Sequence, residues 1–321
     1  MKKLENILLF VDDEPDLDIL ERALNVAEVY GANLTVAAVV PSARSQVVLS
    51  RPGIDFGELE QLLSDDSRSQ LEEAVEKVER PGVETNTVVL TGSPVPSIVG
   101  YIVEHGIDYL IKAPSPNDGL RDRLLGSIDM RLMRAAPCMV GIGRARKTDG
   151  PLRAVVAVDI DENDEQIAAL NRRILDSALL AQAGEHVEIF VIHAWDFYGY
   201  TLLAHGRGRI PPKQLKEALD YEQTRRQEWL DSLIDSYKQS LEPAQSALFD
   251  PTPVLLRGDP RIVIPKKVHE LDADIIGLGS ASRGGLGGLM IGNTAEEILL
   301  RVNCTVAVSK PEGFESPFGA S

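Results

Sequence analysis

The chain has 321 residues, enough for two domains of ordinary size, and its composition (44% hydrophobic, 26% charged) excludes a largely disordered protein. Against 33 Lys and Arg it carries 49 Asp and Glu, and the resulting net charge of −16 disfavours binding of nucleic acid or an anionic membrane through bulk charge. Two cysteines, Cys138 and Cys304, are too few for a disulfide framework or a cysteine-rich zinc site.

Neither a membrane-spanning segment nor a signal peptide is expected. No apolar run approaches the ~18 residues that a bilayer-spanning helix needs. The run Ile7–Val11 follows two lysines, but it is shorter than the ~7–15 apolar residues of a signal peptide and ends at Asp12. We therefore expect a cytoplasmic protein that binds neither membrane nor nucleic acid.

Apolar runs alternate with helical patterns along residues 1–147. A strand expected at Ile7–Val11 precedes a helix at Asp16–Tyr30, in which apolar residues recur three or four positions apart and which Gly31 is placed to end. The elements expected next are a strand at Leu34–Val40, a helix at Glu58–Glu79, a strand at Val83–Leu90, a helix at Val95–Glu104, a strand at Tyr109–Lys112, a helix at Gly126–Arg134 and a strand at Met139–Ile142.

Residues 151–311 show the same order of elements with one added segment. We expect an insertion at Trp195–Pro211, then a long helix at Lys213–Leu241, and a disordered tail at 312–321. The apolar stripe of the long helix is typical of core packing rather than of a cofactor site. Its members are Leu215, Leu219, Leu230, Leu233, Ile234, Tyr237 and Leu241.

The two halves are copies of one unit. Asp12 and Asp159 close the first strand of each copy and are 147 residues apart, whereas later landmarks share one offset of 166 residues, so the second copy carries an insertion of about 19 residues. The later landmarks are Gly92 and Gly258, Asp108 and Asp274, Gly126 and Gly292, and Cys138 and Cys304. Short apolar strands joined by helices predict an α/β fold in which helices cover both faces of a parallel sheet.

Candidate ligand-binding residues follow the strands of the second copy. Asp159 ends the first strand, Gly279 and Ser282 follow the strand Ile275–Leu278, and Gly292-Asn293 opens a helix. Parallel sheets bind ligands beyond the carboxyl ends of their strands, where small residues and helix starts let backbone N–H groups approach a phosphate. Asp159 would accept hydrogen bonds from a ribose hydroxyl or an adenine amine.

Each of these features also has a purely structural explanation. Thr294 and Glu297 fit a capping box, so capping alone would explain this helix start. The segment Gly284–Gly288 fits a mobile loop, and Asp159 fits the cap of the following helix. The common placement of the features at strand ends favours a site.

The duplicated unit resembles the universal stress protein family in its tandem arrangement. The resemblance rests on the Asp after the first strand, the Gly-x-Pro after the third and a Gly-x-x-small, nine residues, Gly-polar pattern near the end, and it covers residues 4–311. It implies two flavodoxin-like domains, each a five-stranded parallel sheet with helices on both faces, and a stress-response role. In some members it implies an ATP or AMP site, with Mg²⁺ accompanying the nucleotide. The residues carried over to this chain are Asp159, Leu278, Gly279, Ser282, Gly292 and Asn293.

Both copies depart from the family's nucleotide motif, which is G-x-x-G, nine residues, then G followed by Ser or Thr. In the second copy Ser282 and Asn293 replace a Gly and the Ser/Thr, and both still offer polar groups to a phosphate. In the first copy the loop positions hold Ala113 and Pro116, and proline has no N–H to donate. We therefore expect nucleotide only in the second copy, with the first as its structural partner.

A receiver-like signalling domain in the first half is an alternative. Asp12-Asp13 and Lys112 resemble the acidic pair and the lysine of response-regulator receivers. Those domains also need a phospho-accepting Asp after the third strand, and the matching strand here leads into Thr91. Outside that alternative, Asp12-Asp13 is expected to cap a helix or to face solvent.

Three further features favour packing over chemistry. Asp159-Ile160-Asp161 is similar to the nucleophile motif of haloacid-dehalogenase-type phosphatases, but the basic and acidic partners of that chemistry are not evident. His193 has no evident Ser or Cys partner and is expected to be a packed histidine. Cys138 and Cys304 precede the last strand of each copy, which favours packing over redox work.

Three classes of function follow. The favoured one is a nucleotide-responsive stress protein without efficient catalysis; the others are an interaction scaffold that binds no nucleotide and a slow ATP hydrolase. No catalytic residue and no metal ligand is assigned. The last strands, Met139–Ile142 and the segment around Ala307, are expected to pair within the chain, because pairing covers two open sheet edges. The result would be an intramolecular pseudo-dimer, with a further homodimer left open.

Overall fold

The computed structural model describes residues 4–42, 56–114, 128–144, 150–160, 164–184, 186–197, 200–205, 210–280 and 291–318. Its first half contains β1 (Asn6–Val11), α1 (Leu17–Tyr30), β2 (Asn33–Val40), α2 (Phe56–Val78), β3 (Thr85–Thr91), α3 (Pro94–His105), β4 (Tyr109–Lys112), α4 (Ile128–Ala135) and β5 (Met139–Ile142). Its second half contains β6 (Leu152–Ala157), α5 (Glu165–Ala181), β7 (Val187–Trp195), α6 (Tyr200–His205), α7 (Pro212–Gln239), α8 (Pro243–Leu248), β8 (Thr252–Arg257), α9 (Pro260–Glu270), β9 (Ile275–Gly279), α10 (Asn293–Leu299) and β10 (Thr305–Ser309).

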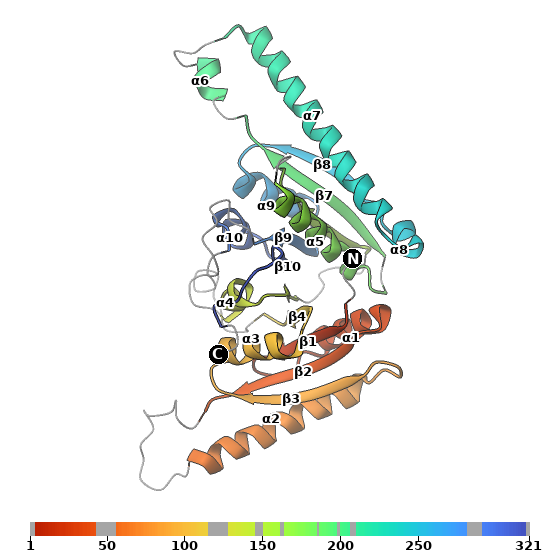
Figure 1. Cartoon of the computed structure of the whole chain (residues 1–321), viewed down its shortest axis with the longest axis vertical. Helices are drawn as coiled ribbons and strands as arrows, with labels where there is room; N and C mark the ends of the chain where they lie inside the picture. Colours follow the sequence, from red (N-terminus) through yellow and green to blue (C-terminus); the bar gives the residue numbers. More distant parts are fainter. Residues whose placement is uncertain are drawn as a thin grey trace.

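The strands of the described residues form one continuous sheet in the order β3-β2-β1-β4-β5-β10-β9-β6-β7-β8 (Figure 1). Within each half every neighbouring pair is parallel, which confirms the predicted five-stranded parallel sheets. The strand order reverses beside β1 in the first half and beside β6 in the second. In such sheets a crevice opens at this reversal, beyond the carboxyl ends of the strands.

Local sequence signals explain the ends of α1. Asp16 is its N-cap, and its carboxylate accepts a hydrogen bond from the Ile19 N–H at 3.1 Å. Gly31 ends the helix in the left-handed conformation, with φ of 62°, which a side chain would disfavour. The predicted bounds of this helix are therefore confirmed.

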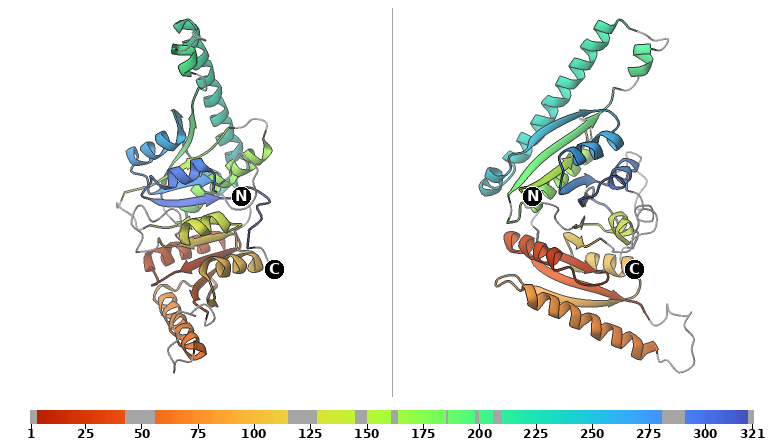
Figure 2. Two further views of the ribbon diagram at one scale, coloured as in Figure 1. Left: turned by 90° about the vertical axis from the view of Figure 1, so that its left-hand side faces the viewer. Right: turned by 180° about the vertical axis from the view of Figure 1, so that it is seen from behind.

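The long helix α7 is held by its C-terminal half. Leu230, Ile234 and Tyr237 are buried against α5 and the sheet, so the predicted packing of the apolar stripe is confirmed. The Tyr237 hydroxyl also donates to the Asp176 carboxylate on α5 at 2.7 Å, and burial raises the pKa of Asp176. Figure 2 shows α7 and α2 extending from opposite ends of the molecule. In the described part of the chain, no helix is both long enough and apolar enough to cross a bilayer.

The helix α10 begins at Asn293, as expected from the sequence, but it is capped differently. Gly292 is the N-cap and makes no side-chain capping hydrogen bond, so Thr294 lies inside the helix and the capping box predicted with Glu297 is wrong. The α5 N-cap is Asp164, whose carboxylate accepts from the N–H groups of Gln166 and Ile167. Asp159 therefore does not cap α5.

One hydrophobic core spans the two halves on the face covered by α3, α4, α9 and α10. The opposite face carries two separate cores, one beneath α1 and α2 and the other beneath α5 and α7. The shared core includes Leu110 from the first half and Ile276 from the second. Burial of apolar surface is the main favourable term in folding, so the shared core couples the two halves.

The two halves join edge to edge through β5 and β10, which confirms the predicted pairing of the last strands; the two strands are antiparallel. Gly141 lies opposite Ala307, and these residues correspond at the internal offset of 166. On either side, Val306 pairs with Ile142 and Val308 pairs with Val140. At the same offset Val306 corresponds to Val140 and Val308 to Ile142, so the two pairs are related by a two-fold rotation about the central pair. The contact is therefore an internal version of the isologous contact of a symmetric dimer.

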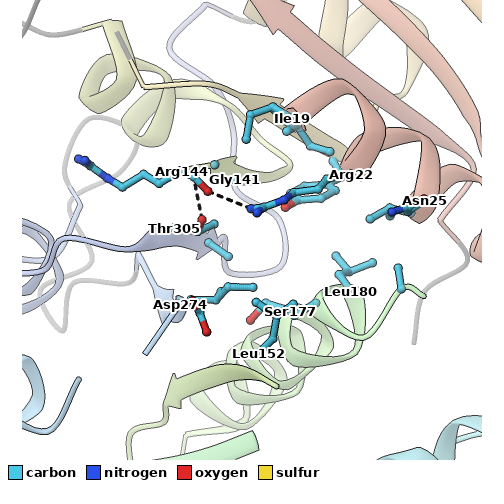
Figure 3. Close-up of a pocket in the computed structure, with 18 of the residues that line it drawn as sticks. Ile19, Arg22, Asn25, Gly141, Arg144, Leu152, Ser177, Leu180, Asp274 and Thr305 are labelled. Atoms are coloured by element: carbon cyan, nitrogen blue, oxygen red, sulfur yellow. Dashed lines mark hydrogen bonds between the residues drawn. The ribbon is translucent and has the colours of Figure 1, made fainter. Parts of the chain in front are cut away.

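Polar contacts reinforce this junction on both faces. Between α1 and α5 the Arg22 guanidinium donates to the Arg144 carbonyl oxygen at 2.9 Å, and the Arg144 N–H donates to the Thr305 hydroxyl at 2.9 Å (Figure 3). A small cavity of about 100 Å³ remains beside them. On the other face Arg134 pairs with Glu296 at 2.6 Å.

Residues 312–318, expected to be disordered, lie against the folded body. The Phe314 ring lies 4.4 Å from the Lys310 ammonium nitrogen, and Phe318 packs against the shared core. The segment thus covers part of the junction, which its Gly- and Pro-containing sequence did not indicate. Residues 319–321 lie outside the described part.

Candidate functional site

A cavity of about 630 Å³ lies at the carboxyl ends of β6, β7 and β9, where the strand order of the second half reverses. Five of the six residues singled out from the sequence line it: Asp159, Leu278, Gly279, Gly292 and Asn293. The sixth, Ser282, lies outside the described residues, as does the segment Gly284–Gly288. The tertiary structure therefore brings together residues that are more than 130 positions apart in the chain.

Asp159 is held in place by a side chain that the sequence analysis missed. The amide of Asn171 on α5 accepts from the Asp159 N–H at 3.1 Å and donates to the Asp159 carbonyl oxygen at 2.8 Å. Asn171 is 1% exposed and also lines the cavity. The sequence did offer a signal for this role: Asn171 is a polar residue that lies with Leu170 and Ile174 on the buried face of an amphipathic helix.

Gly279 is required by helix packing. A Cβ atom at this position would lie 2.7 Å from the Cδ2 atom of Leu170 and 3.1 Å from the Cδ1 atom of Ile174, both on α5. The missing side chain thus lets α5 approach the end of β9, which is a different reason from the phosphate contact inferred from the sequence.

Main-chain hydrogen bonds place the start of α10 beside β9. The Gly292 N–H donates to the Ser280 carbonyl oxygen at 3.3 Å, and the Ser280 N–H donates to the Ser309 carbonyl oxygen at 2.9 Å. Gly292 and Asn293 therefore lie next to the ends of two central strands, at one side of the cavity.

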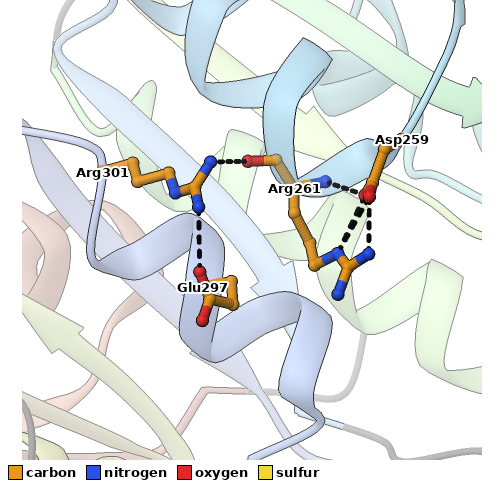
Figure 4. A network of polar contacts seen from close by, with 4 residues as sticks. All are labelled: Asp259, Arg261, Glu297 and Arg301. Atoms are coloured by element: carbon orange, nitrogen blue, oxygen red, sulfur yellow. Dashed lines mark hydrogen bonds and ion pairs between the residues drawn. The ribbon is translucent and has the colours of Figure 1, made fainter.

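The α9 start forms another wall, and a surface network stabilises it (Figure 4). Asp259 caps α9 and binds the Arg261 guanidinium, while Arg301 reaches the Arg261 carbonyl oxygen at 3.1 Å and Glu297 on α10 at 3.1 Å. The hydrogen bond from Arg261 holds the pKa of Asp259 below its usual range. The network connects two helices that line the cavity through Pro260 and Ile298.

His193 and Arg226 form a polar pair in the cavity wall. His193 is 2% exposed; its Nδ1 atom donates to the Val158 carbonyl oxygen at 3.1 Å, so Nε2 is the acceptor for the Arg226 guanidinium at 3.3 Å. The prediction of a packed histidine is confirmed. Arg226 comes from α7, which the sequence analysis treated as a core helix, so its place in this cavity was missed.

Aromatic rings and guanidinium groups alternate beside this pair. The Trp195 ring lies 5.4 Å from the Arg226 guanidinium carbon and 5.9 Å from that of Arg257, which is also 4.7 Å from the Tyr200 ring. These contacts connect α6, in the inserted segment, and α7, which follows it, to β7 and β8 at the edge of the cavity.

The first half has a corresponding cavity of about 470 Å³, in which a salt bridge network replaces apolar residues. The Lys112 ammonium is 1% exposed and lies 3.3 Å from Asp12 and 2.9 Å from Asp129. Asp12-Asp13 was expected to cap a helix or to face solvent. The pair does not cap a helix, because Asp16 caps α1, but both residues are exposed, and Asp12 also pairs with Lys112.

The second half holds Leu278 and Ala295 where the first holds Lys112 and Asp129. Lys112 pairs with Ile142 in the sheet, and Leu278 pairs with Val308 at the equivalent register. Of the three residues of this salt bridge network, the aspartate after the first strand has an identical counterpart, Asp159, in the described lining of the second cavity. Ala113 lines the first cavity, whereas Pro116 lies outside the described residues.

The receiver alternative finds no support in this geometry. The strand β3 ends at Thr91, with no aspartate, and Lys112 pairs with two carboxylates at the end of β4. Within the described ranges, no three His, Cys, Asp or Glu side chains are grouped so as to hold a metal ion.

Cys138 and Cys304 are buried, and burial raises the pKa of the Cys138 thiol to about 12, which agrees with the packing role predicted for both.

Comparison with known proteins agrees with this architecture. The model of the universal stress protein family matches the chain twice, over residues 3–143 and 152–310. The chain belongs to the universal stress protein family. The predicted resemblance is thereby confirmed, and this universal stress protein is of the tandem type.

Relatives of this universal stress protein share its length. Universal stress protein E of Escherichia coli K12 is 21% identical over 335 residues, which cover 99% of this chain and 97% of the relative. The Photorhabdus laumondii protein of the same name is 25% identical over 252 residues, or 73% of this chain and 71% of the relative.

Solved structures share the fold. A functionally unknown protein from Pseudomonas aeruginosa PAO1 has a TM-score of 0.65 at 23% identity, covering 96% of this chain and 93% of the other. A universal stress protein from Archaeoglobus fulgidus has a TM-score of 0.56 at 19% identity, covering 95% and 96%.

Proposed function

We propose that the cavity beside Asp159 binds a nucleotide, ATP or AMP, and that this universal stress protein is a cytoplasmic regulatory protein without efficient catalysis. The observation that carries the proposal is the convergence of Asp159, Leu278, Gly279, Gly292 and Asn293 on one cavity of about 630 Å³. Small-molecule sites occupy ~300–1,000 Å³ and combine mostly apolar walls with a few polar groups.

Three kinds of group in the cavity lining would bind three parts of a nucleotide: the base, the ribose and the phosphate. Branched apolar side chains such as Ile167, Ile174 and Ile264 form walls that suit a purine base. The Asp159 carboxylate would accept hydrogen bonds from a ribose hydroxyl or an amine. Gly292 caps α10 and its own N–H donates to Ser280, so the N–H groups that would suit a phosphate are those of the first turn, beginning at Asn293.

The first-half cavity is proposed to exclude nucleotide. Its ammonium group is already paired with two carboxylates, and its described rim carries the further acidic residues Asp13, Glu14 and Asp16. A phosphate would be repelled by these carboxylates, because like charges at close range destabilise one another. Each chain should therefore bind one nucleotide.

Calorimetric titration of the full chain with ATP and with AMP tests the proposal. We expect one site per chain, and we expect Asp159→Ala to weaken binding by about tenfold, since a hydrogen bond to a charged group contributes ~1.5–3 kcal/mol. Asp13→Ala, at the rim of the first-half cavity, is the matched control and should leave the affinity unchanged. Absence of binding by the wild-type chain would refute the proposal and favour the scaffold alternative.

A measurement of ATP turnover distinguishes the proposed regulatory protein from a slow ATP hydrolase. The proposal expects ATP to be recovered intact after incubation with Mg²⁺. Release of ADP that depends on Mg²⁺ and disappears in Asp159→Ala would instead assign slow hydrolysis to this cavity. No metal ligand of the protein enters the proposal, since the described residues offer no three-ligand cluster.

A further inference from the structure

The cavity of the second half contains a cation that has no counterpart in the first-half cavity. Arg226 reaches it from α7, the helix that follows the insertion, and its side chain is 21% exposed. The described lining of the first-half cavity includes no residue of α2, the corresponding helix, and its cation is Lys112. Among the described lining residues, a guanidinium group from this helix therefore reaches one of the two duplicated cavities and not the other.

The contacts of this guanidinium group are long and incomplete. One terminal nitrogen of Arg226 lies 3.3 Å from the His193 Nε2 atom. Its buried Nε atom lies 3.5 Å from the Glu222 carboxylate, an ion pair in which Nε makes no hydrogen bond in the described structure. Buried polar groups of this kind are ordinarily hydrogen-bonded, and leaving one unpaired carries a free-energy cost. An acceptor on a ligand would satisfy that group.

The surroundings orient Arg226 without neutralising it fully. His193 is fixed through its bond to the Val158 carbonyl oxygen, and the Trp195 ring lies 5.4 Å from the guanidinium carbon. Val158 directly precedes Asp159, so the cation and the proposed ribose-binding carboxylate are connected through one short polar chain. Glu222 divides its carboxylate between Arg225 at 3.1 Å and Arg226 at 3.5 Å.

We propose that Arg226 binds the anionic group of the ligand, so that the cavity selects phosphorylated nucleosides over uncharged ones. This inference rests on the proposed nucleotide site and names the residue that makes it specific. A planar guanidinium matches the oxygens of a phosphate in two parallel hydrogen bonds, which an uncharged ribose cannot supply. The Asp196 carboxylate also lines the cavity, but its Oδ1 atom accepts from the Phe197 N–H.

Calorimetry with AMP and adenosine tests the inference on three variants of the full chain. Arg226→Gln should weaken AMP binding by about 10- to 100-fold, which corresponds to losing a hydrogen bond to a charged group, and should change adenosine binding less than twofold. Arg226→Lys keeps the charge and the apolar stem and should lose less AMP affinity than Arg226→Gln. Lys238→Gln, which removes a cation of the same helix outside the cavity lining and away from Glu222, is the matched control and should bind AMP as the wild type does.

The outcomes separate this inference from the proposed function. If the wild-type chain binds AMP and Arg226→Gln binds it equally well, the proposed function stands and the role of Arg226 is wrong. Equal losses of AMP and adenosine affinity would also overturn it, because they would indicate a general effect on the cavity. If the wild-type chain binds neither AMP nor ATP, both proposals fail together. Thermal unfolding of each variant checks that its fold is retained.

Discussion

Lys112 shows how one side chain changes the chemistry of a duplicated cavity. Its buried ammonium lies between the carboxylates of Asp12 and Asp129, which are 20% and 15% exposed. Lys112→Met would leave two carboxylates together without their counter-charge. We expect the free energy of unfolding in urea to fall by about 3 kcal/mol, at the lower end of the range for breaking a buried pair, because both carboxylates keep some solvent.

Replacing the charges together distinguishes this explanation from a general loss of packing. Lys112→Leu combined with Asp129→Ala reproduces the residues of the second copy, Leu278 and Ala295. We expect the double variant to be more stable than Lys112→Met, since one unpaired carboxylate is removed along with the ammonium. Lys77→Met, which breaks an exposed pair with Glu73, should cost less than about 1 kcal/mol. A double variant as unstable as the single one would contradict the electrostatic explanation.

Lys310 makes stability depend on pH above neutrality. Its ammonium group reaches the carbonyl oxygens of Met133 and Arg134 at the end of α4, and burial lowers its pKa to about 7. The unfolded chain, with an ordinary lysine pKa near 10.4, binds more protons than the folded chain above pH 7. The contribution of Lys310 to stability should therefore rise from pH 7 to pH 9, by at most about 1.4 kcal/mol per pH unit.

The comparison of wild type with Lys310→Met isolates this contribution. Urea unfolding between pH 7 and pH 9 should show a steeper gain with pH in the wild type than in the variant. The raised pKa of Cys138 lowers the stability of both proteins as the unfolded thiol ionises at about pH 8.5, so the difference between the two profiles, and not the slope of either, reports Lys310. Parallel pH profiles for the two proteins would show that Lys310 does not titrate in this range.

At the scale of elements, α7 combines an anchored and a projecting part. Leu230 is fully buried beneath its C-terminal half, whereas Tyr221 is 68% exposed nearer its start. Leu230→Ala should lower the free energy of unfolding by about 2–5 kcal/mol, as for a large-to-small change in a core, and Tyr221→Ala by less than about 0.5 kcal/mol. Urea unfolding measures both, and a comparable loss in the two variants would show that the projecting part is also packed.

Most elements were predictable because their signals are local. The α1 cap at Asp16 and stop at Gly31, and the strand Tyr109–Lys112, depend on neighbouring residues and on periodicity. The added helix α8 was missed, since its six residues are too few for a periodic pattern. The start of α10 at Gly292-Asn293 was predicted, but the capping box of Thr294 and Glu297 was wrong, because Gly292 caps the helix without a side-chain hydrogen bond.

At the scale of the whole molecule, the shared core and the β5–β10 pairing predict that the two halves unfold together. Both tryptophans of the chain, Trp195 and Trp229, lie in the second half, so their fluorescence reports that half alone. Far-UV circular dichroism reports both halves. We expect the two urea transitions to coincide, as in a two-state process, because unfolding one half would expose the core and the sheet edge of the other. A fluorescence transition separate from the dichroism transition would show that the halves unfold independently.

The sequence by itself determined the duplication, the order of the strands and main helices in each copy, and the joining of the copies through their last strands. These properties follow from patterns within a few residues and from one internal comparison. Only the tertiary structure decided which side chains meet: Arg226 with His193, Asn171 with Asp159, and Lys112 with Asp12 and Asp129. The physical reason is that periodicity records which face of an element is buried, whereas contacts between elements depend on how helices pack on the sheet, and that packing is set by the whole core at once.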